Sequence, residues 1–270
     1  MRKPARGPAV RSRKRFGQNF LTDAHTISRI VDAISPAPDQ LVVEIGPGHG
    51  ELTGELVKSR CHLTAIEIDR DLVADLKQRF ETLTIIETDV LKFDFSDIAA
   101  QAKELGVPLR IVGNLPYNIS TPLLFKLFEY LPDVTDMHFM LQLEVVERMV
   151  ARPSSENYGR LSVMSQYYCE ATKLFSVPAS AFRPKPRVMS AIVRLKPHRI
   201  GPVAEDTRLL GRMVNEAFSQ RRKTIRNALG SFLSQDDIEA LGLDPRLRPE
   251  NLTVSDYVTC ANYLKARQSS

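Results

Sequence analysis

One stretch, residues 111–117, combines groups that could hold an aromatic amine. Two apolar residues and Gly113 lead into Asn114, and Leu115, Pro116 and Tyr117 follow. The Asn114 side-chain oxygen and the Leu115 carbonyl can each accept a hydrogen bond from one –NH2 group, and the Tyr117 ring can stack on a planar base. Asn and Pro are also ordinary turn residues, so the same letters fit a strand end followed by a turn. The surrounding segments must decide between an amine socket and a turn.

A glycine-rich segment lies upstream of this stretch, with Glu44, Gly46, Gly48 and Gly50 at alternate positions. It follows the apolar run 41–45 and leads into a helical pattern, which is the context of a nucleotide-type site. Its third glycine comes one residue earlier than in dinucleotide sites. Glu44 would repel a phosphate but tolerate an ammonium or sulfonium group. S-adenosylmethionine is a ligand that carries such groups.

Two further carboxylates end the next apolar runs. Glu67 follows the run 63–66, where it can accept hydrogen bonds from ribose hydroxyls, and Asp89 follows the run 83–86, where it can accept one from a cofactor adenine amine. Either acid alone reads as a solvated residue at a strand end. Three acids at successive strand ends around one glycine loop instead predict a cofactor crevice.

Short apolar runs alternate with amphipathic helical patterns from residue 23 to about residue 200. This alternation predicts a Rossmann-like α/β fold with an open, mostly parallel sheet covered on both faces. After a linker rich in Pro and Gly, the pattern is helical only. The expected domains are therefore a basic arm at 1–22, a catalytic domain at 23–200 and a small helical domain at 203–270.

The composition excludes several classes of protein. No apolar run approaches the ~20 residues of a membrane span, so no membrane partner is expected. Cys61, Cys169 and Cys260 are scattered, which favours reduced thiols in a cytoplasm, and the five histidines show no ligand spacing, so no metal is expected. Residues 1–22 contain seven Lys or Arg and no acid, whereas the net charge of the whole chain is +5. Such an arm suits a polyanion or is a solvated tail.

At this level of detail the chain resembles the small-subunit (16S) ribosomal RNA adenine N6-dimethyltransferases. The resemblance runs from residue 16 to about 225 and rests on motifs at residues 18–21, 44–53, 67–69, 89, 113–120, 182–190 and 217–223. It implies a class I S-adenosylmethionine-dependent methyltransferase sheet with a small C-terminal all-helical domain. It also implies dimethylation of two adjacent adenosines in a terminal hairpin of that RNA during ribosome biogenesis. The implied partner is the assembling small ribosomal subunit.

The resemblance also implies roles for individual residues. Asn19 and Leu21 would close over the cofactor, and the residues expected to contact it are Gly46, Gly48, Glu67, Asp89 and Asn114. The target adenine would be held by Asn114, Leu115, Pro116 and Tyr117, with Phe182 on its other face, although Phe182 alone reads as a core aromatic. A basic cluster expected on a helix would contact RNA phosphates, and it consists of Arg221, Arg222, Lys223 and Arg226. A companion group in a loop consists of Arg183, Lys185 and Arg187.

The expected chemistry is amine methylation by orientation. Two acceptors that pull on the amine hydrogens can aim the nitrogen lone pair at a sulfonium methyl group, and the base must be flipped or single-stranded to reach them. Alternatives are the large-subunit adenine methylases of macrolide resistance, a DNA adenine methylase and a non-catalytic ribosome-assembly factor. Pro47 and the Arg221–Lys223 run favour the small-subunit family, and the intact glycine loop argues against a non-catalytic protein.

Overall fold

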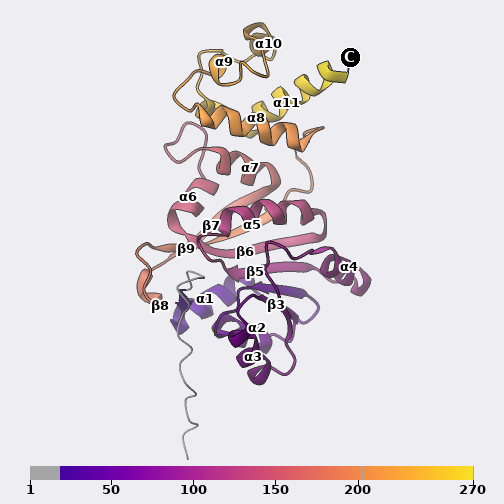
Figure 1. Ribbon diagram of the computed structural model, residues 1–270, viewed down its shortest axis with the longest axis vertical. Helices are drawn as coiled ribbons and strands as arrows, with labels where there is room; N and C mark the ends of the chain where they lie inside the picture. The colour runs from indigo at the N-terminus through magenta and orange to yellow at the C-terminus, as the bar shows by residue number, and fades with distance from the viewer. Residues whose placement is uncertain (1–18, 202, 270) are drawn as a thin grey trace, which may run out of the picture. The chain divides into compact units, whose positions relative to one another are not determined.

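The computed structural model describes residues 19–201 and 203–269, so most of the expected basic arm lies outside the described residues. The chain divides into two compact units (Figure 1). One unit combines Met1–Leu143 with Leu174–Arg194, and the other combines Glu144–Lys173 with Leu195–Ser270. In the described part of the chain, no helix has the length and apolar character needed to cross a bilayer.

The first unit contains most of a sheet whose strands follow the order β4-β3-β2-β5-β6-β9-β7. The strand bounds are β2 (Leu41–Ile45), β3 (His62–Glu67), β4 (Thr84–Glu87), β5 (Leu109–Asn114), β6 (Val134–Gln142), β7 (Cys169–Val177) and β9 (Ser190–Pro197). β2 pairs in parallel with β3 and β5, and the pairs β3–β4 and β5–β6 are also parallel. The carboxyl ends of these strands therefore meet at one edge, which confirms the predicted α/β fold.

The centre of this sheet is covered on both faces. All five residues of β2 are buried, including Glu44. Because successive side chains of a strand point to opposite faces, an unbroken buried run requires packing on both sides. The apolar runs in the sequence predicted such strands for this reason.

Helices follow the strands of the first unit as α1 (Ala24–Ile34), α2 (Glu51–Lys58), α3 (Arg70–Arg79), α4 (Ser96–Leu105) and α5 (Ser120–Leu127). The Asp23 side chain caps α1 by accepting from the Thr26 N–H at 2.8 Å, and Ile27, Ile30 and Ile34 are buried along one face. A separate two-stranded sheet pairs β1 (Phe20–Leu21) with β8 (Phe182–Arg183), antiparallel. This pair joins the segment after the arm to the loop that follows β8 and contains Pro184 and Pro186.

The second unit is helical, with α6 (Leu143–Met149) and α7 (Arg160–Tyr168) preceding α8 (Thr207–Ser219), α9 (Ile225–Ala228), α10 (Gln235–Ala240) and α11 (Val254–Ser269). α7 packs against α8 and α11. The Phe218 ring lies 6.2 Å from the Tyr158 ring and 6.0 Å from the Tyr257 ring. Residues 144–173 therefore group with the C-terminal helices, whereas the sequence placed the whole of 23–200 in one domain. A capping box precedes α11, because the Thr253 N–H donates to the Asp256 side chain and the Asp256 N–H donates to the Thr253 hydroxyl oxygen.

Candidate functional site

A cavity of about 230 Å³ opens at the carboxyl ends of β2, β3 and β5 in the first unit. Its lining includes every residue that the sequence assigned to cofactor binding, namely Asn19, Leu21, Gly46, Gly48, Glu67, Asp89 and Asn114. Leu115, Pro116 and Tyr117 line it as well. The structure thus brings the glycine loop and the amine socket to one cavity.

The glycine loop adopts a backbone that only glycine accepts without strain. Gly46, Gly48 and Gly50 have φ angles of +67°, +59° and +77°. A Cβ atom on Gly48 would lie 2.9 Å from the Phe20 ring, and the Gly48 N–H donates to Glu67 at 3.3 Å. The loop therefore packs closely against Phe20 of β1, at a position where a side chain larger than glycine's would clash.

Glu67 is fixed at the end of β3 by three backbone donors. Its Oε1 atom accepts from the Ile68 and Asp69 N–H groups at 2.9 and 3.0 Å, and its Oε2 atom accepts from Gly48. Burial raises the pKa of this carboxyl, while the three hydrogen bonds lower it. A carboxylate offers about four acceptor positions, so Glu67 retains capacity for a hydroxyl group of a ligand.

Glu44 lies deeper, and only 2% of its surface is exposed. Its Oε2 atom accepts from the Thr53 hydroxyl of α2 at 2.6 Å. Burial raises the pKa of Glu44, the hydrogen bond from Thr53 lowers it and the charge of Glu67 raises it, and together they bring this pKa to about 7. Glu44 can therefore be neutral or charged near pH 7, and a nearby cation would favour its charged form.

The charge of the lining residues favours a cationic ligand. Glu44, Glu51, Glu67 and Asp89 line the cavity, and no Lys or Arg is among the described residues that do so. A pyrophosphate would meet carboxylates without a compensating side-chain cation. S-adenosylmethionine carries ammonium and sulfonium groups, and its ribose hydroxyls can donate to Glu67, so the residues present fit this cofactor.

Asp89 marks the third acidic strand end, as expected. It follows β4 by two residues, and its Oδ1 atom accepts from the Leu91 N–H at 3.0 Å. This bond holds the turn 89–93 and presents the neighbouring residues Thr88 and Val90 to the cavity. Ile68 also lines it and is 43% exposed, so a flat ring can be held between apolar groups here.

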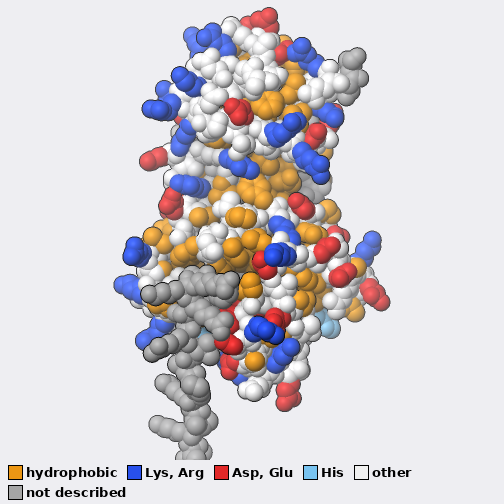
Figure 2. Space-filling model, in the orientation of Figure 1, with side chains coloured by type: hydrophobic (Ala, Val, Ile, Leu, Met, Phe, Trp, Pro, Cys, Tyr) orange, Lys and Arg blue, Asp and Glu red, His pale blue; other side chains and the backbone are white. Residues whose placement is uncertain are grey.

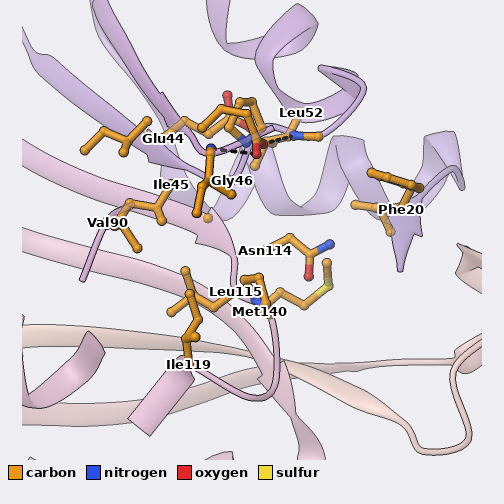
Figure 3. A pocket seen from close by; sticks show the side chains of 18 of the residues that line it. Phe20, Glu44, Ile45, Gly46, Leu52, Val90, Asn114, Leu115, Ile119 and Met140 are labelled. Atoms are coloured by element: carbon orange, nitrogen blue, oxygen red, sulfur yellow. Dashed lines mark hydrogen bonds between the residues drawn. The ribbon is translucent and has the colours of Figure 1, made fainter. Parts of the chain in front are cut away.

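The Asn114 carboxamide has a defined orientation at the end of β5. Its Nδ2 atom donates to the Asn19 carbonyl oxygen at 3.1 Å. Figure 3 shows Asn114 between Gly46 on one side and Met140 on the other. Since Nδ2 is committed to Asn19, the Oδ1 atom is the part of the carboxamide that can accept from a substrate amine.

The rest of the socket is anchored to the two neighbouring strands. The Leu115 N–H donates to the Met140 carbonyl oxygen at 3.2 Å, which fixes the backbone just after Asn114. The Tyr117 hydroxyl lies 2.9 Å from the Ser190 hydroxyl at the start of β9, and Ser190 is fully buried. The Tyr117 ring is thus held at its hydroxyl end, two residues after a fixed backbone position.

Several lining residues were not assigned from sequence. The Phe20 and His49 rings lie 4.2 Å apart, centroid to centroid, and both border the cavity. His138 on β6 also lines it, and its Nδ1 atom lies 3.6 Å from Asp136. Phe20 lies inside the motif at residues 18–21, but strand alternation would have placed its side chain on the opposite face from Asn19 and Leu21. His138 gave no signal, because a single histidine in an apolar strand carries no spacing information.

Phe182 lies in the core and not among the cavity-lining residues. Its side chain is 2% exposed and packs in one cluster with Leu21, Ile27 and Ile192. Its backbone register places it opposite Leu21 in the β1–β8 pair. A role in covering the adenine stays a prediction, and it requires this side chain to become accessible.

The basic residues form two groups, one in each unit. Arg183, Lys185 and Arg187 are exposed in and after β8 of the first unit. In the second unit, Arg221, Arg222 and Lys223 are exposed in the turn between α8 and α9, and Arg226 is exposed on α9. The expectation that this second group is borne on a helix is therefore wrong for its first three members, because α8 ends at Ser219.

Arg221 differs from the neighbouring cations. Its Nη2 atom donates to the Glu156 carbonyl oxygen at 2.7 Å, and its Nε atom lies 3.9 Å from Glu250. Arg221 thus joins the 152–159 loop to the C-terminal helices. Figure 2 shows Lys and Arg side chains spread over the visible face of α8 to α11.

The parallel sheet, its positive-φ glycine loop and the acid-lined cavity define a class I S-adenosylmethionine-dependent methyltransferase. The sequence matches the ribosomal RNA adenine dimethylase family over residues 9–266. The chain belongs to this family.

Individual relatives agree with this assignment. The chain is 56% identical over 260 residues to ribosomal RNA small subunit methyltransferase A of Aromatoleum aromaticum, covering 95% of this chain and 96% of the relative. It is 52% identical over 258 residues to the protein of the same name from Acinetobacter baylyi, covering 94% and 93%. Among solved structures, a dimethyladenosine transferase from Plasmodium falciparum matches with a TM-score of 0.79 at 25% identity, covering 92% of this chain and 98% of that one. The 23S rRNA methyltransferase ErmE matches with a TM-score of 0.69 at 26% identity, covering 92% and 100%.

Proposed function

We propose that this protein transfers methyl groups to the N6 amines of two adjacent adenosines in a terminal hairpin of small-subunit ribosomal RNA, two groups to each, during assembly of the small subunit. The observation that carries the proposal is the orientation of Asn114. Its Nδ2 atom is bound to Asn19, so its acceptor oxygen remains for a substrate amine beside an acid-lined cavity. Relatives at 52–56% identity that are named for the small subunit support the choice of RNA.

The socket acts on the amine by geometry. The Asn114 Oδ1 atom and the Leu115 carbonyl accept the two hydrogens of the N6 group, which turns the nitrogen lone pair away from the ring. Tyr117, fixed through Ser190, stacks on the base and sets its plane. Orientation of this kind supplies a large part of the rate enhancement without a strong base.

S-adenosylmethionine supplies an electrophilic methyl group on a positively charged sulfur. Glu67 and Asp89 are the residues that would hold its ribose and adenine, and Glu44 would balance its positive charge. The socket would aim the nitrogen lone pair at that methyl group, and the transfer would leave the carbon–sulfur electron pair on sulfur. The N–H proton then leaves the product amine, and the acceptor dipoles of Asn114 and Leu115 stabilise the charge that develops on nitrogen.

RNA delivery is assigned to the exposed cations of the two units. Arg222, Lys223 and Arg226 are exposed, as are the cations at residues 183–187, and this exposure supports a role in phosphate contacts. The three cysteines are free, which fits the reducing cytoplasm where the proposal places the protein.

Methylation of isolated RNAs tests the proposal. Purified protein is incubated with S-adenosylmethionine and with small-subunit RNA, partly assembled small subunits or large-subunit RNA, and dimethyladenosine is measured by mass spectrometry. We expect product only from the small-subunit substrates, at two adjacent positions. Product confined to large-subunit RNA would instead show that the protein methylates adenine in the large-subunit RNA. Absence of S-adenosylmethionine binding in equilibrium dialysis would support a non-catalytic assembly role.

A further inference from the structure

Two neighbouring apolar side chains are exposed in the loop between β8 and β9. Val188 is 45% exposed and Met189 is 44% exposed, whereas the next residue, Ser190, is fully buried. In Figure 1 the segment around β8 extends outward from the sheet of the first unit. Adjacent exposed apolar side chains next to a functional site indicate a contact surface.

The charge of this loop identifies the kind of partner. Arg183, Lys185 and Arg187 are exposed in the same loop, and residues 183–189 contain no Asp or Glu. Cations followed directly by apolar side chains match a nucleic acid, which offers phosphates and, where a base has left the stack, an apolar base face.

The backbone of the loop is held close to the socket. The Met189 carbonyl oxygen accepts from the Leu143 N–H at 2.9 Å, and Ser190 lies 2.9 Å from the Tyr117 hydroxyl. Standard bond lengths then place the Met189 Cα atom within about 10 Å of that hydroxyl. The backbone of Met189 is therefore held near Tyr117, the group proposed to stack on the target base, and Val188 precedes it in the same loop.

We propose that Val188 and Met189 form an apolar wedge that enters the RNA next to the target adenosine and keeps that base unstacked while it occupies the socket. The wedge rests on the proposed function, because it presumes an RNA substrate. A base that leaves its stack exposes the faces of its neighbours, and unstacking costs a few kcal/mol per step. Apolar side chains that cover those faces offset this cost, as the flipping of a base into an enclosed pocket requires.

Fluorescence of 2-aminopurine tests the wedge apart from the chemistry. The probe is a small-subunit RNA hairpin in which 2-aminopurine replaces one of the two adjacent adenosines. This base lacks the N6 amine, so it reports unstacking at a position that cannot itself be methylated. The variants are Val188→Ala with Met189→Ala, and Val188→Lys with Met189→Lys, and the matched control is Leu105→Ala, which is 49% exposed at the end of α4.

The wild-type protein and the Leu105→Ala control are expected to raise the fluorescence on binding. The double Ala variant should lose most of this rise and about 10- to 100-fold in kcat, with RNA affinity changed less. The double Lys variant should bind RNA at least as tightly as wild type and still fail to raise the fluorescence, which separates a wedge from a phosphate contact.

A full fluorescence rise and normal kcat in both double variants would overturn the wedge while leaving the proposed function intact. Absence of methyl transfer to any RNA by the wild-type protein would instead refute the proposed function. These two failures are therefore distinguishable.

Discussion

Glu44 gives a prediction with a direction and a magnitude. Burial raises the pKa of its carboxyl to about 7 from 4.5. At 1.36 kcal/mol per pKa unit, keeping Glu44 ionised in the folded protein costs about 3 kcal/mol. Because its pKa is higher in the folded than in the unfolded state, the folded protein binds more protons between these values. The free energy of unfolding contributed by Glu44 therefore falls as the pH rises from about 4.5 to about 7.

A bound cationic cofactor offsets the cost of ionising Glu44, because its positive charge favours the ionised carboxylate. If only ionised Glu44 is competent, about one-tenth of the protein can bind at pH 6 and about nine-tenths at pH 8, so the affinity for S-adenosylmethionine should rise about tenfold between them. Isothermal titration calorimetry from pH 6 to pH 8.5 measures this rise.

The variant Glu44→Gln keeps an acceptor for Thr53 but removes the titration. It should bind the cofactor more weakly at pH 8 and lose the Glu44-dependent slope. The variant should also unfold with a higher free energy than wild type at pH 8. This difference between variant and wild type should be larger at pH 8 than at pH 4 by up to about 3 kcal/mol, because only the wild type loses stability as Glu44 ionises. Glu55→Gln, on the same helix but paired with Lys58 at the surface, is the control and should keep the wild-type profile. A wild-type affinity that does not change across pH 7 would refute the reasoning.

Three further predictions concern the socket and the RNA contacts. Asn114→Ala should lower methyl transfer by roughly 100- to 1000-fold while cofactor binding stays largely intact, and wild-type turnover of radiolabelled methyl groups in this variant would contradict the socket. Tyr117→Phe and Ser190→Ala each remove one side of a single hydrogen bond, so their effects on kcat, roughly 3- to 10-fold each, should not add in the double variant; full additivity would show that the bond is not shared. Arg222→Ala should weaken RNA binding and flatten its salt dependence without changing the unfolding temperature, whereas Arg221→Ala should cost about 1 kcal/mol in urea unfolding because it loses its bond to the 152–159 loop. An Arg222→Ala variant with an unchanged salt slope would remove that residue from the RNA contacts.

Local features of the fold were predictable from the sequence because each has a local physical cause. Asp23 accepts a hydrogen bond from the N–H of Thr26, only three residues further along the chain, and so caps α1. The run 41–45 is almost entirely apolar, so it must be buried on both faces of the sheet. The domain boundary was not predictable. Tyr158 and Tyr257 are almost 100 residues apart in sequence, and their joint packing on Phe218 leaves no periodic signal.

The sequence by itself determined the chemical groups of the candidate site. Glycines at alternate positions require a backbone that other residues resist, and acids at successive strand ends must converge when the strands are parallel. Only the tertiary structure decided how these groups are oriented. The hydrogen bond from Asn114 to Asn19 and the contact of Tyr117 with Ser190 each join residues more than 70 positions apart. The burial of Phe182 likewise depends on the pairing of β8 with the distant strand β1. The reason is physical: residue types and local spacing are written along the chain, whereas the direction of a side chain is set by neighbours that meet only when the sheet has formed.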